Sequence, residues 1–482
     1  MAGLAASGWY NDAMRCSSRH ARMMEFVKTT TALACLLLTT SLMNDVVFPR
    51  FDEAFTYARD ISVLANSVAL VVIGLVATFR PSALRANALR WAAVGCLVAS
   101  AVLLPASLRV GNAVGLTVSA SFAAVGRSWI VVVVGMAASR FALRRAGVCV
   151  ALAFVAYYTA TAFSWAVPTA AGVVLFLVLP LASLALTWRC AMPMLKAAEM
   201  GDAPIDFSIT QPSSFLPLGS QLFACLFLFR VAFGYSLRFG EVEGVPLSDA
   251  LAIVPVAAVA VAIALSRATF PADLLTQASV LLVVAGFFAS SMSHDLAPMA
   301  SVTLLSAGNA LFDMVAWVVL IAVAGRNERG ALAAFAWGRG LTGLGTVVGA
   351  SLGVLANGLV GDSSFGFEIV IGALILVFVG YALIGLKSFS FSSTIEGVTP
   401  VDGTVAKAPE RDFEARCREV AERFGLSPRE LEVFMMLARG RDRAYIQERL
   451  VVSRNTVKAH VKHVYAKLGI HTHQELIDLV EE

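Results

Sequence analysis

A short run near the C-terminus places basic and polar side chains on one face of a predicted helix. Four apolar residues recur at helical spacing over 453–468 and predict one buried stripe: Val457, Val461, Val464 and Leu468. The opposite, exposed face then carries Asn455, Lys458, Ala459 and Lys462. A lysine ammonium can donate hydrogen bonds to guanine O6 and N7 in the major groove, and a small alanine permits contact with a thymine methyl. The pattern therefore predicts a helix that contacts base edges in DNA.

The start of this helix has residue types that bind phosphate. Ser453 is a predicted N-cap, and Ser453 and Thr456 can bond a phosphate together with the free backbone amides of the first turn. Arg441, Arg443 and Arg454 add positive charge suited to the DNA backbone. The alternative interpretation is that the lysines form only a solvated surface, which is the usual role of lysine on a helix. The agreement between helix spacing and caps favours DNA binding.

Neighbouring elements position this helix. Ser427-Pro-Arg-Glu430 is a capping box with proline at the first helical position, so a helix begins there, and Gly440 ends it. A second helix is predicted over 442–450, and a further capping box at 472–475 begins a fourth. These elements predict a four-helix module with a helix-turn-helix.

The module resembles the LuxR-type (NarL/FixJ-like) helix-turn-helix in four segments: Leu426–Phe434, Gly440, Ser453–Val461 and Lys467–Gly469. The resemblance covers only this C-terminal part, and there it is dense. It implies base contacts by Lys458, Ala459 and Lys462 and phosphate contacts by Ser453 and Thr456. It also implies a homodimer on double-stranded promoter DNA through the final helix, with Leu476, Ile477 and Val480 as dimerisation residues.

The chain before about residue 388 is too apolar for a soluble protein. The 482 residues are 58% hydrophobic and 15% charged, and the apolar excess lies in long uncharged runs. A bilayer core needs about 20 apolar residues per helix, and about twelve such runs are present. They lie at 28–48, 61–79, 90–108, 112–138, 146–166, 169–188, 215–235, 247–265, 273–291, 297–324, 331–357 and 366–386. The predicted fold class is all-α, a polytopic membrane bundle followed by the four-helix module.

Basic residues give the orientation of this bundle. They cluster before the first run, after the second and after the fourth, where Arg140, Arg144 and Arg145 lie. By the positive-inside rule both termini are cytoplasmic, in a multi-pass protein of the bacterial inner membrane. The predicted parts are a cytoplasmic segment at 1–27, a membrane domain at 28–387, a flexible linker without helical period at 388–411, and the module at 412–482.

No sequence pattern argues for an enzyme. The sequence has neither a P-loop nor an H-E-x-x-H motif, and its seven cysteines have no C-x-x-C spacing. His460 and His463 have no Cys or carboxylate partners at the spacing of a metal site. We therefore expect no catalytic residues, no metal and no cofactor.

Among the polar residues inside predicted spans, where a charge is costly, four are candidates for a ligand site. Arg127 is in the fourth run, Arg230 in the seventh, and Asn309 and Asp313 in the tenth. We predict a ligand pocket in which the arginines suit an anionic group and Asp313 balances a cation or an arginine. A structural ion pair between the two halves of the bundle is the alternative. Arg339, nearer the cytoplasmic end of its span, is expected to snorkel.

The layout resembles the major facilitator architecture of two six-helix halves, with a longer cytoplasmic loop at 189–214 between the sixth and seventh runs. In that architecture spans one, four, seven and ten line a central cavity, so the resemblance implies that the four polar residues converge. The loop at 80–90 lacks the Gly-x-x-x-Asp-Arg pattern common in the family's transporters, which argues against active transport.

The sequence therefore predicts a membrane-bound one-component transcription regulator that senses a small molecule through its membrane domain and binds promoter DNA. Its expected partners are the lipid bilayer, an unidentified small-molecule ligand, a second copy of the chain and RNA polymerase. The alternative is a facilitator-type transporter with an attached regulatory DNA-binding domain, which a flux assay separates from the first hypothesis. A two-component output protein would need a phosphoacceptor receiver domain, and the membrane part occupies that place.

Overall fold

The computed structural model of the chain consists of two compact units, Met1–Gly403 and Thr404–Glu482. It describes residues 2–48, 55–163, 167–199, 220–243, 253–265, 270–290, 297–360, 372–373, 376–381, 389–397, 410–438, 446–447, 450, 454–470 and 476. The elements assigned within these residues are all helices. Each unit is described by itself.

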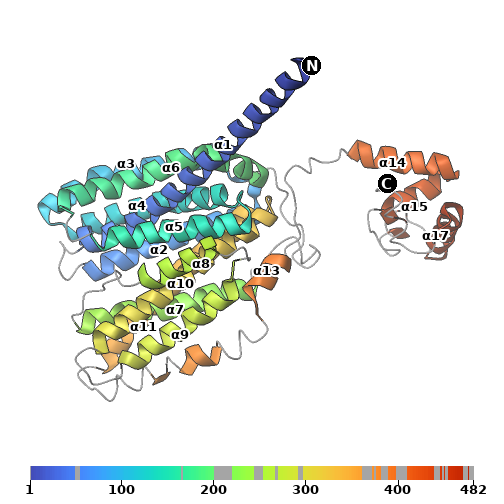
Figure 1. Ribbon diagram of the computed structural model, residues 1–482. Coiled ribbons are helices and arrows are strands. Elements are labelled where there is room, and N and C mark those ends of the chain that lie inside the picture. Colours follow the sequence, from blue (N-terminus) through green and yellow to red (C-terminus); the bar gives the residue numbers. More distant parts are fainter. Residues whose placement is uncertain are drawn as a thin grey trace. The chain divides into compact units, whose positions relative to one another are not determined.

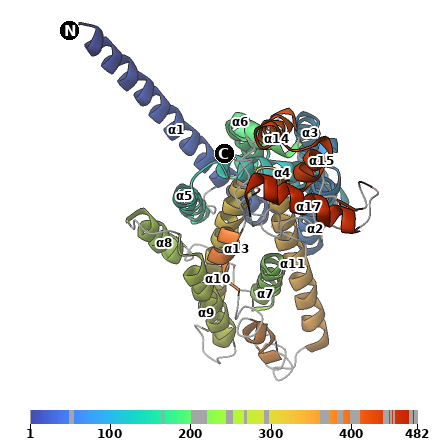
Figure 2. The same cartoon turned by 90° about the vertical axis from the view of Figure 1, so that its right-hand side faces the viewer.

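The first half of the membrane unit consists of six long helices that lie side by side (Figures 1 and 2). Their bounds are α1 (Ala2–Leu42), α2 (Phe55–Phe79), α3 (Ala86–Val110), α4 (Ala113–Ala138), α5 (Leu143–Thr161) and α6 (Thr169–Glu199). A π-helical turn, Met43–Val47, continues α1, and a short 3-10 helix, Pro81–Ala83, separates α2 from α3. Helices suit these apolar runs because they pair every backbone amide and carbonyl within the segment, where lipid offers no partners.

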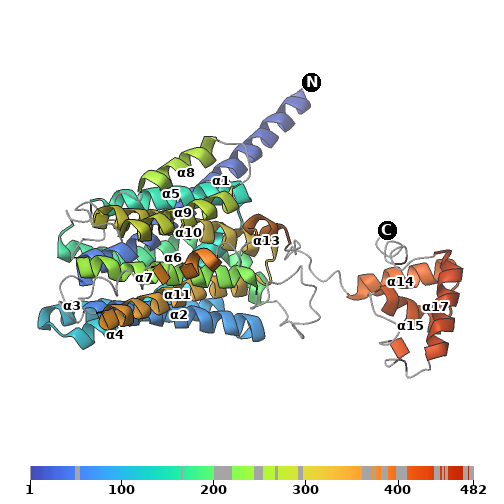
Figure 3. The same cartoon turned by 90° about the horizontal axis from the view of Figure 1, so that it is seen from below.

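The second half of the unit continues with α7 (Gln221–Glu243), α8 (Ile253–Leu265), α9 (Ala272–Ser290), α10 (Ala297–Arg326) and α11 (Ala331–Val360). Within this half α7 packs on α11 and α9 on α10. The halves meet where α2 packs against α11 and where α5 packs against α8 and α10. In Figure 3 these helices run roughly parallel to one another along the unit.

Eight described helices are long and apolar enough to cross a bilayer, namely α2 to α6 and α9 to α11. The described parts of α7 and α8 that are apolar, Gln221–Ser236 and Ile253–Ile263, are shorter. The first predicted run, 28–48, forms the end of α1 and the turn after it, so the predicted boundary at residue 28 falls inside a helix. The last predicted run, 366–386, lies largely outside the described residues.

The linker predicted from residue 388 differs from the structure at its start. A short helix, α13 (Phe391–Gly397), lies at the end of the bundle and packs against α9 and α10 (Figures 1 and 3). Phe391 and Ile395 are four residues apart on one helical face, and their side chains are buried in the core of the membrane unit. The serine-rich sequence hid this pattern, because two apolar residues are too few to establish a helical period.

The second unit contains α14 (Glu410–Phe424), α15 (Pro428–Ala438) and α17 (Arg454–Leu468). It has its own hydrophobic core, which includes Phe434, Ile446, Val461 and Leu476. The helix predicted over 442–450 lies mostly outside the described residues, but Ile446, Gln447 and Leu450 are helical. A separate core is the physical requirement for a module that folds without the membrane unit.

Candidate nucleic-acid interface and intramembrane polar cluster

Helix α17 divides into a buried and an exposed face at the predicted positions. Val457, Val461, Val464 and Leu468 are each at most 5% exposed, and they pack in the core of the second unit. Thr456, Lys458, Ala459 and Lys462 are exposed. Three of the side chains that the sequence assigned to DNA contact, Lys458, Ala459 and Lys462, are therefore exposed on a helix of 15 residues.

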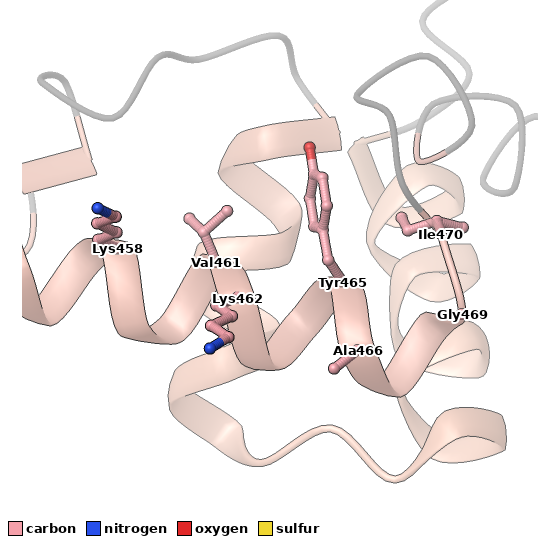
Figure 4. A pocket seen from close by; sticks show the side chains of 7 residues that line it. All are labelled: Lys458, Val461, Lys462, Tyr465, Ala466, Gly469 and Ile470. Carbon is pink, nitrogen blue, oxygen red and sulfur yellow. The ribbon is translucent and has the colours of Figure 1, made fainter.

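The exposed face borders an open groove of about 540 Å³. Lys458 and Lys462 line it at one end, and Tyr465, Ala466, Gly469 and Ile470 continue it along the helix (Figure 4). Two ammonium groups beside a shallow, partly apolar wall suit the chemistry of DNA, whose phosphates are anionic and whose major groove carries thymine methyl groups.

A contact among four residues holds the end of α17 against the start of α15. The Ser427 backbone amide donates to Glu430 Oε2 at 2.7 Å, and the Glu430 amide donates to Ser427 Oγ at 3.3 Å, which is the predicted capping box. Lys467 Nζ donates to the same Glu430 oxygen at 2.7 Å and to the Gly425 carbonyl at 2.9 Å. This cluster fixes α17 relative to α15.

Lys467 belongs to the segment that carries the family resemblance, but the sequence predicts no role for it. The signal that was available is its place in the last turn of α17, where cations are favoured by the helix dipole. Its hydrogen bond is also the main reason why the pKa of Glu430 is lowered from 4.5 to about 2, with the Ser427 amide as the next cause. Glu430 is therefore ionised at neutral pH, as the hydrogen bonds from Lys467 and Ser427 require.

A second contact joins α15 to Leu450, which precedes α17 in the chain. Arg429 Nη2 donates to the Leu450 carbonyl at 3.1 Å, and Arg429 Nη1 donates to Glu432 Oε2 at 2.6 Å. Leu450 is the last residue of the predicted second helix. Side chains of α15 thus contact the chain on both sides of the turn into α17.

The predicted dimerisation residues do not all face outward. Leu476 is fully buried in the core of the second unit, so the module's own packing already uses this side chain, and its role in a dimer stays a prediction. Ile477, Val480 and Ser453 lie outside the described residues. Asn455 is in α17, but its side chain is not among those described.

Three of the four predicted intramembrane residues come together, all in the second half of the bundle. Arg230 of α7 donates from Nη1 to Asn309 Oδ1 of α10 at 2.7 Å and from Nε to Thr346 Oγ1 of α11 at 3.1 Å. Arg230 also lies within electrostatic range of Asp313. The cluster therefore links three helices of one half.

Close approach of α7 and α11 makes this reach feasible. A Cβ at Gly345 would collide with the Phe227 carbonyl, and a Cβ at Gly349 would collide with the Val231 carbonyl. The glycines allow the two helix backbones to touch, as small residues do in membrane bundles.

Asp313 pairs with an arginine that the sequence analysis placed elsewhere. Arg339 Nη1 lies 2.9 Å from Asp313 Oδ1, and the Arg339 guanidinium stacks 4.6 Å from the centre of the Trp317 ring. The expectation that Arg339 snorkels is therefore wrong, because a carboxylate one helix away offers a stronger partner than the distant interface. The pair joins α10 and α11 within the second half, and an ion pair between the two halves stays a prediction.

Arg127 belongs to a different place in the bundle. Its Nη2 donates to Thr40 Oγ1 of α1 at 3.1 Å, within the first half. The structure thus brings Arg230, Asn309 and Asp313 into one cluster, while the described hydrogen bond of Arg127 goes to another helix pair.

The run Gly349–Gly353 has the G-x-S-x-G spacing of a hydrolase nucleophile, but not its context. It lies inside α11, and Ser351 Oγ donates to the Val347 carbonyl at 2.9 Å as an ordinary intrahelical hydrogen bond. A nucleophile of this type needs a strand-to-helix turn.

Residues 425–480 match the family model of the bacterial regulatory proteins of the luxR family. The C-terminal module is a LuxR-type helix-turn-helix domain. It is similar to the oxygen regulatory protein NreC of Staphylococcus aureus strain JH9, with 43% identity over 53 residues. That match covers 11% of this chain, and the chain spans about a quarter (24%) of the length of the curated relatives it matches.

The membrane unit has a facilitator-like fold. The human organic anion transporter MFSD10 (TETRAN) superposes with a TM-score of 0.52 at 14% identity, over 74% of this chain and 98% of that one. A bacterial homologue of the iron transporter ferroportin, in its outward-facing state, gives a TM-score of 0.52 at 12% identity, over 76% of this chain and 99% of that one. At such low identity the likeness concerns the fold alone. The chain is thus a polytopic membrane protein with a DNA-binding domain.

Proposed function

We propose that this protein is a membrane-bound one-component transcription regulator. Its facilitator-like unit senses a small molecule, and its LuxR-type domain binds promoter DNA as a homodimer and acts on RNA polymerase there. The observation that carries this proposal is the presence, in one chain, of an exposed lysine face on α17 and a polar cluster held by three membrane helices.

The polar cluster supports a ligand site because its charged side chains are partly exposed, neither fully buried nor fully solvated. The side chains of Arg339 and Asp313 are 17% and 16% exposed. Arg230, Arg339 and Asp313 together carry one excess positive charge, which suits a ligand with an anionic group. A ligand that competes for Arg230 or Asp313 would change the contacts among α7, α10 and α11.

The cellular location of the protein follows from the need to reach DNA and from where helices leave the membrane bundle. A DNA-binding domain must face the compartment that holds DNA, so we assign both termini to the cytoplasm and the bundle to the inner membrane. The emergence of α1 and of α13 at the same end of the membrane unit supports this assignment (Figure 1).

DNA binding is tested on the second unit alone, because Thr404–Glu482 is a compact unit with its own core. Genomic DNA fragments that bind this unit are first selected and immobilised. The affinity of the unit for these fragments should fall steeply as the salt concentration rises. Lys458→Ala and Lys462→Ala should each weaken binding to a selected fragment by about 1 to 3 kcal/mol if they contact bases. Arg423→Ala, a basic residue of α14, is the matched control. Wild-type affinity in both lysine variants would refute this assignment of the DNA-contacting face.

Transport is the second candidate function, because solved structures that share the fold are transporters. The loop at 80–90 lacks the pattern common in facilitator transporters, and this favours sensing. Proteoliposomes separate the two functions: a transporter moves a ligand identified by binding across the membrane down its gradient, and a sensor binds it without flux.

A further inference from the structure

Helix α13 is fastened to the membrane unit by specific hydrogen bonds. Asp273, in the first turn of α9, accepts a hydrogen bond from Ser390 Oγ at 2.8 Å and another from the Phe391 backbone amide at 2.6 Å. Arg326, the last residue of α10, donates from Nη1 to the Glu396 carbonyl at 2.9 Å. Both ends of α13 are therefore held, one by each of two packed membrane helices.

Apolar burial adds to this fastening. Phe391 is 2% exposed and Ile395 6% exposed, and both belong to the core of the membrane unit. Phe389 makes an edge contact with Phe391, with ring centres 4.9 Å apart. The other face of the helix is different: Ser393 is exposed, and its hydroxyl bonds only the Ser390 carbonyl of its own turn. α13 is docked by one face, as a separable element would be.

Helix α10 connects this docking site with the intramembrane polar cluster. It carries Asn309, which contacts Arg230, and Asp313, which contacts Arg339. The helix ends at Arg326. The rise of an α-helix places Arg326 roughly 20 Å from Asp313 along the axis. A displacement of α10 at the polar cluster therefore reaches the contact with α13 through one continuous helix.

From these contacts we infer that residues 389–397 form a latch, the α13 latch, which restrains the DNA-binding domain while it is docked and releases it when α10 moves. The inference rests on the proposed function. α13 is the last described element before α14, so undocking frees residues 389–397 and, when they extend, adds roughly 30 Å of reach. Longer reach lets two domains on neighbouring chains pair on DNA, since pairing depends on whether the tethers span the distance.

Docking is measured on the intact protein in permeabilised membranes by the labelling of an introduced thiol with a maleimide. Ile395→Cys reports the buried face and Ser393→Cys the exposed face, with labelling of the parent chain subtracted. Asp273→Ala, which removes both acceptors, should raise labelling at Ile395→Cys at least tenfold and leave Ser393→Cys unchanged. Ser390→Ala leaves the membrane helices unchanged, and it removes the hydrogen bond from Ser390 Oγ to Asp273 and the one that Ser390 Oγ accepts from the Ser393 amide. Because the bond from the Phe391 amide to Asp273 remains, the rise should be smaller, and a folding defect of α9 is not needed to explain it.

Coupling is measured in the same membranes and in cells. Asp313→Asn should raise labelling at Ile395→Cys at least threefold, and Thr303→Ala, a half-buried position of α10 whose hydroxyl bonds its own helix, should not. Occupancy of the promoter fragment that the intact protein enriches in chromatin immunoprecipitation should rise at least threefold in Ser390→Ala and Asp273→Ala, at unchanged membrane abundance.

Labelling that does not respond to Asp273→Ala would overturn the latch, as would increased labelling with unchanged promoter occupancy. The proposed function fails by a different result, the absence of DNA binding by the isolated Thr404–Glu482 unit. The two failures are therefore distinguishable.

Discussion

Replacing Glu430 with glutamine tests how the recognition helix is held. In the folded domain one carboxylate oxygen accepts from Lys467 Nζ and from the Ser427 amide, both at 2.7 Å. Glu430→Gln keeps the size of the side chain and an acceptor for the cap, but it removes the charge that binds Lys467. The side chain is 8% exposed, so water replaces the lost partner poorly.

The expected loss of stability follows from these contacts. A hydrogen bond to a charged group contributes about 1.5 to 3 kcal/mol, and part of the capping box remains in the variant. Lys467 is 40% exposed, which weakens its share through solvent screening. We expect a loss of about 2 kcal/mol, which corresponds to a fall in Tm of roughly 10 °C for a domain of this size.

The matched control is Glu432→Gln, two residues along the same helix. Glu432 pairs with Arg429 at 2.6 Å, but its side chain is 47% exposed, so an i,i+3 surface pair of this kind should contribute no more than about 0.5 kcal/mol. The assay is urea unfolding of Thr404–Glu482, followed by circular dichroism. Equal stability of Glu430→Gln and wild type at pH 7 would refute the claim that this cluster holds α17.

The same residue predicts a pH dependence. The pKa of Glu430 is lowered from 4.5 to about 2 on folding, first by Lys467 and then by Ser427, so the folded state favours the ionised carboxylate. Its contribution is complete above pH 4.5 and is lost as pH falls from there towards 2. The stability difference between wild type and Glu430→Gln should therefore shrink across this window. A difference that stays constant from pH 7 to pH 2 would contradict the assignment.

The remaining predictions concern the membrane unit. Asp313→Leu alone should lower the abundance of the protein in the membrane, because it leaves Arg339 without its 2.9 Å partner in a low dielectric. The double variant Asp313→Leu with Arg339→Met should recover the abundance, which quantitative immunoblotting measures. Equal abundance of the single variant and wild type would show that the pair is not structural. Gly345→Val should also lower abundance, because a side chain there meets the Phe227 carbonyl, whereas Gly358→Ala meets open space and serves as the control. Topology reporters should give a cytoplasmic signal when fused at 214, 330 and 482 and an external one at 241 and 362, and one reversed pair would mean a miscounted span.

The DNA-binding domain was more predictable from sequence than the membrane cluster, for physical reasons. Helix caps and a buried stripe are local, so Ser427, Glu430 and the valines of α17 could be assigned without knowing the fold. The partner of Asp313 depends on which helices touch, and sequence alone left Arg339 near the interface, where most such residues snorkel. Leu476 shows the same limit, because an apolar residue of a final helix suits a dimer surface and a core equally well.

The junction was the least predictable part. α13 is a helix because Asp273 and Arg326 fasten its ends and because Phe391 and Ile395 find a core, and none of these partners is close in sequence. A serine-rich segment with two apolar residues has no such signal by itself.

The central claim, that one chain is both an intramembrane sensor and a DNA-binding regulator, is tested most directly by chromatin immunoprecipitation of the intact, membrane-bound protein. Discrete promoter fragments should be enriched from wild type and lost from the Lys458→Ala, Lys462→Ala double variant at equal membrane abundance, while Arg423→Ala retains them. Enrichment that survives the double variant, or the absence of discrete fragments from wild type, would contradict the account.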